Sequence, residues 1–103
     1  MFGTIAIATP KPGQEAAVVE HFNQWWKNRA PSVPGPLLGT VYRKSDNASE
    51  LMVTVVFSSR AAYDANAADP AQDAWYRKLV EMLEGEPEWI DGDVLACHSR
   101  GAV

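Results

Sequence analysis

The amino-acid sequence predicts an α+β domain whose elements follow the order β-α-β-β-α-β. Three observations carry this prediction: short β-branched segments recur, two amphipathic helical segments separate them, and turn residues stand at the junctions. The order is the split βαβ arrangement of ferredoxin-like folds. We therefore expect a four-stranded antiparallel sheet with two helices on one face.

The first β-α unit is expected within residues 2–31. Residues 2–8 (FGTIAIA) are typical of a strand, and residues 11–13 (KPG) of a turn. A helix is predicted over residues 14–30, where Pro31 stops it. Its apolar face carries Val18, Val19, Phe22, Trp25 and Trp26.

Three further strands are expected. Residues 37–44 (LLGTVYRK) and 50–57 (ELMVTVVF) form a hairpin across the turn at 45–47. Residues 88–97 (EWIDGDVLAC) give the last strand, in which Gly92 is expected to mark a bulge or turn.

The second helical segment is expected to have two parts. A short helix over 60–68 begins at a Ser58 or Ser59 cap. A longer helix then runs to Glu84, with Asp69 as N-cap and Pro70 in the first position. Its apolar face carries Trp75, Tyr76, Leu79, Met82 and Leu83.

Length and composition limit the classes of partner. The 103 residues suit one domain, expected over 1–98, with a loose tail at 99–103. The net charge of −4 and the absence of basic runs argue against nucleic acid and anionic membranes. The apolar start is too short for a membrane span. The single Cys97 excludes an internal disulfide and a cysteine-based zinc site, and is consistent with a cytoplasmic location.

The predicted central strands are apolar on both faces. In residues 50–57, Leu51, Val53 and Val55 alternate with Met52 and Val56. Two helices cover one face of such a sheet, so the other would be an exposed apolar surface. We expect a second copy of the chain to cover it in a homodimer. The alternative is that β-propensity alone places valine and isoleucine there.

Four segments give the chain a family resemblance: residues 11–13, Pro34-Gly35, 57–63 (FSSRAAY) and 68–75 (ADPAQDAW). Together they resemble the antibiotic biosynthesis monooxygenase (ABM) group of the dimeric α+β barrel superfamily, over about residues 2–97. Members include cofactor-independent monooxygenases acting on aromatic phenols or quinols, haem degraders, isomerases and decarboxylases. The resemblance implies the fold and a pocket between helices and sheet; the fold does not choose the activity.

Three functions remain open on this basis. The first is a monooxygenase without metal or organic cofactor, acting on a small phenol, quinol or polyketide-like molecule. The second is a non-catalytic dimeric protein that binds a small hydrophobic molecule, for example under stress. The third is an isomerisation or decarboxylation. Oxygen uptake would distinguish the first, and anaerobic turnover the third.

Candidate site residues are polar or aromatic groups on faces that should be buried. The catalytic candidates are Trp75, which corresponds to the family's tryptophan, Asn66 and Gln72. The expected substrate pocket comprises Trp25, Trp26, Arg29, Tyr42, Tyr63, Trp75 and Tyr76.

Each candidate also has a structural interpretation. Arg29 could serve the helix dipole and extend into solvent, while Gln72 could complete the helix cap. Asn66 could satisfy backbone groups at the helix break. The tryptophans could be core, and Trp89 either core or interface.

The histidines argue against haem degradation. The family's haem degraders have a histidine on the second helix, about ten residues after the tryptophan, where this chain has Gly85. They also have an early-strand asparagine, for which the nearest polar residue is Thr4. His21 is expected at the edge of its helix, and His98 lies near the tail. Two histidines this far apart also make no metal site.

Overall fold

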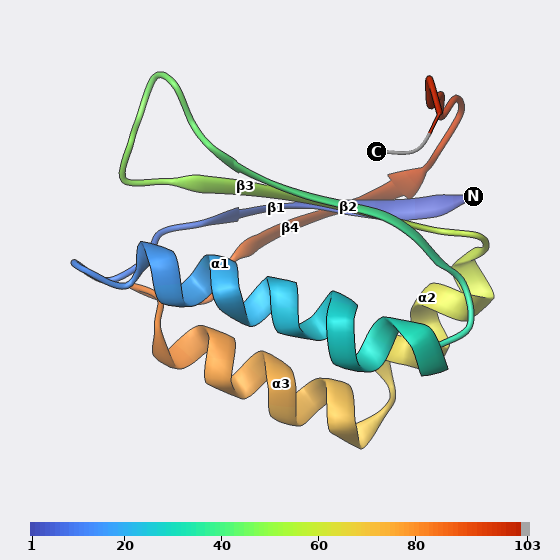
Figure 1. The fold of residues 1–103 in the computed structure, drawn as a ribbon, viewed down its shortest axis with the longest axis horizontal. Helices are drawn as coiled ribbons and strands as arrows, with labels where there is room; N and C mark the ends of the chain where they lie inside the picture. The colour runs from blue at the N-terminus through green and yellow to red at the C-terminus, as the bar shows by residue number, and fades with distance from the viewer. Residues whose placement is uncertain (102–103) are drawn as a thin grey trace.

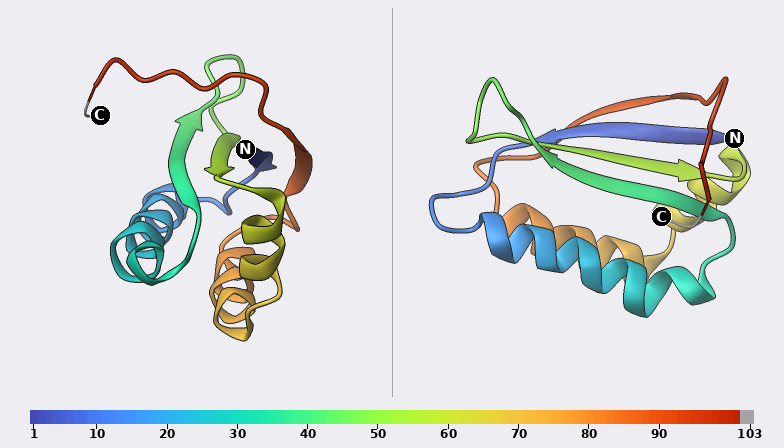
Figure 2. Two further views of the ribbon diagram at one scale, coloured as in Figure 1. Left: turned by 90° about the vertical axis from the view of Figure 1, so that its right-hand side faces the viewer. Right: turned by 45° about the horizontal axis from the view of Figure 1, so that its top comes forward.

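The computed structural model describes residues 1–101 and confirms the predicted order of strands and helical segments. The bounds are β1 (Phe2–Ala8), α1 (Glu15–Gln24), the π-helical turn η1 (Trp25–Arg29), the 3₁₀ turn η2 (Ala30–Ser32), β2 (Pro36–Arg43), β3 (Leu51–Phe57), α2 (Arg60–Ala67), α3 (Pro70–Glu81) and β4 (Glu88–Asp93). The sheet has the order β2-β3-β1-β4 and is antiparallel throughout. All the helices lie on one side of it (Figures 1 and 2).

The first helical segment changes type along its length. It is α-helical to Gln24, and the Ala30 amide then donates to the carbonyl of Trp25, five residues back. Such π turns are frequent at functional sites, because they shift the side chains that follow. The expected extent of 14–30 is close, but a single α-helix is wrong.

The predicted caps of α2 and α3 are confirmed. Ser59 Oγ accepts the amide of Ala62 at 3.1 Å, and Asp69 Oδ1 accepts that of Ala71 at 2.8 Å. The helix α3 ends at Glu81 and not at Glu84. Backbone bonds from Lys11 to Met82 and from Glu84 to Thr9 replace the last helical turn.

Strand β4 is shorter than predicted: it ends at Asp93, which pairs with Phe2, the first residue of β1. The Val94 amide then donates to the carbonyl of Met1. The bulge expected at Gly92 is wrong, since Gly92 pairs with Gly3 in unbroken register. The irregularity of this sheet lies in β2, between Pro36 and Leu38.

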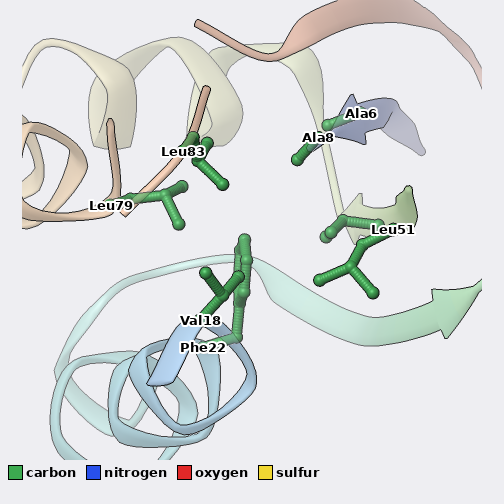
Figure 3. Packing of buried hydrophobic residues seen from close by; sticks show 8 residues of the cluster. Ala6, Ala8, Val18, Phe22, Leu51, Leu79 and Leu83 are labelled. Atoms are coloured by element: carbon green, nitrogen blue, oxygen red, sulfur yellow. The ribbon is translucent and has the colours of Figure 1, made fainter. Parts of the chain in front are cut away.

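The core lies between the sheet and the helices α1 and α3. Figure 3 shows side chains from these layers meeting there. Its buried members are Ala6, Ala8, Val18, Phe22, Leu51, Val53, Leu79 and Leu83. Trp75 and Tyr76 of α3 pack against this core and also line the cavity described below.

The opposite face of the sheet has no cover within residues 1–101. It presents apolar side chains from the outer and central strands, with Ile5 41% and Ile90 52% exposed. Leu38 and Tyr42 extend the same surface along β2. At its centre Thr40 and Thr54 pair their hydroxyl groups. The predicted lack of apolar–polar alternation is thus present on the folded sheet.

No helix in the described part of the chain is both long and apolar enough to cross a bilayer.

Candidate functional site

A cavity of about 430 Å³ opens between the helices and the sheet. Its walls come from α1, η1, β3, α2, α3 and β4, so the fold itself creates it. Eight aromatic side chains line it: Phe22, Trp25, Trp26, Phe57, Tyr63, Trp75, Tyr76 and Trp89. All four tryptophans of the sequence are among them. Flat aromatic walls of this kind bind flat, apolar ligands.

Three of the four indole groups are held by hydrogen bonds. Trp25 Nε1 donates to Gln72 Oε1 at 2.6 Å. Trp89 Nε1 donates to the Tyr76 hydroxyl at 3.3 Å. Trp75 Nε1 donates to the carbonyl of His21 at 3.2 Å. These three N–H groups are therefore occupied by the protein, so a ligand would meet these indoles through their rings and not through their N–H groups.

His21 fixes Trp75 from two sides. The imidazole stacks on the indole with ring centres 4.5 Å apart and an angle of 7° between planes. His21 Nε2 lies 2.8 Å from the Trp75 carbonyl, and because a carbonyl only accepts, this nitrogen carries the proton. The edge position predicted for His21 is correct, but its ring is half-buried and joins α1 to α3.

Two residues that line the cavity carry side-chain amides whose oxygens are engaged by the protein. Gln72 Oε1 accepts from Trp25, and Asn66 Oδ1 accepts from Arg29 Nη2 at 3.1 Å. Indole and guanidinium groups only donate, so both amide oxygens must face them. The two NH₂ groups, which make no hydrogen bond within residues 1–101, are then left for a ligand. This arrangement suits a carbonyl or phenolate oxygen.

Arg29 lies behind Asn66 and does not itself line the cavity. Its side chain is 21% exposed, 3.7 Å from the Asp69 carboxylate. Its Nε is buried without a partner among the described residues. Extension of Arg29 into solvent does not occur; the guanidinium turns inward at the junction of α2 and α3.

Tyr63 forms the end of the cavity nearest β4. Its hydroxyl donates to Asp91 Oδ1 at 3.1 Å, and its ring packs against Phe2 and Phe57. Burial, followed by the nearby Asp91 carboxylate, raises the pKa of Tyr63 to about 12. The phenol therefore stays protonated at neutral pH, and its proton is engaged by the Asp91 carboxylate.

Most of the predicted pocket residues meet at this site. Trp25, Trp26, Tyr63, Trp75 and Tyr76 line the cavity, together with Asn66 and Gln72. Tyr42 does not: strand alternation places it opposite Met52 on the far face of the sheet, 49% exposed. The capping role considered for Gln72 is replaced by its bond to Trp25.

Sequence reasoning missed several residues of the site, including four with an indole or carboxylate group. Trp89, Asp73 and Glu86 line the cavity, and Asp91 holds Tyr63. Trp89 could have been found from the two-residue period of the last strand, because this period puts it beside Ala6 on the helix side of the sheet. Within residues 1–101, no group of three or more histidine, cysteine, aspartate or glutamate side chains could hold a metal ion.

The Tyr63 pKa predicts a stability change at high pH. The pKa of Tyr63 in the folded protein is raised above the ordinary value of 10.0. The contribution of this phenol to the unfolding free energy is therefore complete below pH 10 and is lost as the pH rises to about 12. Between pH 9 and 12 we expect the unfolding free energy of the unmodified protein to fall by about 1 kcal/mol more than that of Tyr63→Phe. This value is reduced to account for the partial exposure of the phenol. Urea titrations of both proteins from pH 9 to 12 measure the difference. Parallel curves for the two proteins would contradict the assignment.

Comparison with known proteins gives one family. The model of the antibiotic biosynthesis monooxygenase family matches residues 1–78. Among curated proteins, none shows significant sequence similarity.

Solved structures share the whole architecture. A candidate antibiotic biosynthesis monooxygenase from Chloroflexus aurantiacus has a TM-score of 0.77 and 20% identity, over 97% of this chain and 98% of its own. One from Caulobacter crescentus has a TM-score of 0.79 and 17% identity, over 92% and 90%. The Mycobacterium tuberculosis protein Rv0793 has a TM-score of 0.77 and 19% identity, over 95% and 98%. At these identities the similarity establishes the common fold.

Proposed function

The chain belongs to the antibiotic biosynthesis monooxygenase family, and from this premise we propose that it oxygenates a small aromatic phenol or quinol without a metal or organic cofactor. One observation carries the proposal. The cavity combines aromatic walls with two amide NH₂ donors, from Asn66 and Gln72, whose oxygens are already engaged by the protein.

Such a substrate can supply the electrons itself. Loss of the phenol proton gives an electron-rich phenolate, whose ring carbon forms a bond to O₂ after electron transfer. The resulting hydroperoxide loses water, leaving a second carbonyl on the ring. A phenol and O₂ thus become a quinone and water: the substrate loses four electrons, and O₂, which gains them, leaves one oxygen atom in each product.

In this proposal the protein acts by placing and stabilising charge. The amide groups of Asn66 and Gln72 hold the phenolate oxygen, which lowers the cost of forming the anion in a largely apolar space. Trp75 and Trp25 hold the ring. The proton would leave toward Glu86, an exposed residue whose carboxylate lines the cavity.

A non-catalytic binding protein is the second candidate. The observation in its favour is that both carboxylates lining the cavity, Asp73 and Glu86, belong to exposed residues, and Asp73 already pairs with Arg77 at 2.8 Å. Neither of these two carboxylates is buried, so a ligand could be held without being deprotonated.

Oxygen consumption separates the two candidates. We expect a panel of hydroxylated naphthalenes and anthracenes to include a compound that causes uptake of one O₂ per quinone formed. Tight binding without uptake, for every compound that binds, would favour the binding protein. Turnover that persists without oxygen would instead indicate isomerisation or decarboxylation.

We further propose that the chain is a homodimer through the open face of the sheet. The support is the row of exposed apolar side chains on that face, Ile5, Ile90 and Leu38 among them. A second copy offers the same surface around a two-fold axis and would cover it.

A further inference from the structure

A second, smaller hollow of about 210 Å³ adjoins the aromatic cavity. It lies between α1 and the strands β2 and β3, and Val19, Gly39 and Val41 line it without reaching the first cavity. The two spaces share four lining residues: Phe22, Trp26, Val53 and Val55. These four residues form the boundary between them.

Trp26 contributes the largest side chain of that boundary. Phe22 and Val53 are buried members of the core, whereas Trp26 is half-buried. Alone among the four tryptophans, its indole N–H makes no hydrogen bond within residues 1–101. The Trp26 ring packs edge-on against the Trp25 ring, with ring centres 5.2 Å apart. Nothing polar therefore fixes its orientation.

The backbone of Gly39 provides the surface on which the Trp26 indole rests. A Cβ at this position would lie 2.6 Å from the Cζ2 and Nε1 atoms of the indole, well inside contact distance. Because Gly39 has no side chain, the Trp26 indole packs directly against the backbone of strand β2. The same indole lines both hollows, whereas Gly39 lines only the smaller one.

We propose that Trp26 is a specificity-determining residue that limits the length of the aromatic ligand by separating the two hollows. This inference rests on the proposed function, since it assumes that the larger cavity takes a flat aromatic molecule. A ligand with more fused rings must displace the indole to enter the second hollow. Shorter ligands fit against the indole and use it as a wall.

The test is a ligand-size series measured by isothermal titration calorimetry. Monohydroxylated naphthalene, anthraquinone and tetracenequinone provide two, three and four fused rings. In Trp26→Leu, the four-ring ligand is expected to bind at least about tenfold more tightly than in the unmodified protein, while the two-ring ligand weakens. Trp26→Phe should give a smaller shift in the same direction, so the order is tested even if the leucine variant folds poorly.

Val19→Ala is the matched control. It enlarges the second hollow but leaves Trp26 in place, so the relative affinities of the series should stay within about twofold of the original. An unchanged series in both Trp26 variants, or four-ring binding in the unmodified protein as tight as two-ring binding, would overturn the inference and leave the proposed function standing. If no aromatic ligand binds the unmodified protein at all, both fail.

Discussion

Replacing Gln72 with glutamate is expected to lower turnover by about 10²- to 10³-fold, the loss typical of removing one donor to a developing oxyanion. The new carboxylate keeps an oxygen for Trp25 Nε1, which now lies 2.6 Å from Gln72 Oε1. It loses the NH₂ group and sets a negative charge beside the phenolate. The expected result is a large fall in kcat with the fold preserved.

Two further variants separate catalysis from stability. Gln72→Leu also removes the acceptor for the Trp25 indole, which costs about 1–3 kcal/mol when a buried donor is left unpaired. Gln24→Glu makes the same chemical change at an exposed position of α1 and should leave turnover unchanged. Steady-state rates with urea unfolding curves measure both quantities. A Gln72→Glu enzyme with wild-type kcat would remove Gln72 from the mechanism.

Placing a lysine at Ile5 is expected to convert the proposed homodimer into a folded monomer of about 11.3 kDa. Ile5 is on the central strand β1 and points away from the helices, next to Ile90 and Thr54. In a dimer formed through this face, the interface would bury one lysine from each copy, and neither lysine would have a partner of opposite charge. An unpaired charge at such an interface costs about 3–5 kcal/mol, which weakens association more than a hundredfold.

The matched control is Ala17→Lys, which adds the same charge on the exposed side of α1. Sedimentation equilibrium at micromolar concentration gives the masses. The control and the unmodified protein should both sediment as dimers. A monomeric unmodified protein, or an Ile5→Lys protein that remains dimeric, would contradict pairing through this face.

The sequence was most informative where local chemistry decides structure. Asp69-Pro70 sets the start of α3 through a side-chain cap and a missing amide proton, both independent of the rest of the chain. The apolar faces of the helices and of β3 likewise follow from spacing alone. This is why the element order, the sheet and most of the cavity wall could be predicted.

The misses concern contacts between distant segments. Strand β4 ends at Asp93, which pairs with Phe2, where β1 begins. Tyr42 faces away from the cavity because the bulge in β2, between Pro36 and Leu38, sets its register. Gln72 reaches Trp25 across 47 positions of sequence. None of these follows from a window of neighbouring residues.

The candidate site was predictable as a set of residues but not as a set of roles. Asn66, Gln72 and Trp75 were identified because polar and aromatic groups fall on buried faces. The direction in which each hydrogen bond runs depends on Arg29, Trp25 and His21, which lie on another helical segment. Only the folded arrangement tells which groups remain for a ligand.

The four indole N–H groups provide the most direct test of the aromatic cavity as the binding site. Because Trp25, Trp26, Trp75 and Trp89 all line it, their ¹⁵N–¹H signals report on its interior. Titration with a hydroxynaphthalene is expected to shift all four, assigned through single Trp→Phe variants, while backbone amides of the turn at 45–47 stay in place. Saturable binding that leaves the indole signals unmoved would show that the ligand sits elsewhere and would contradict the account.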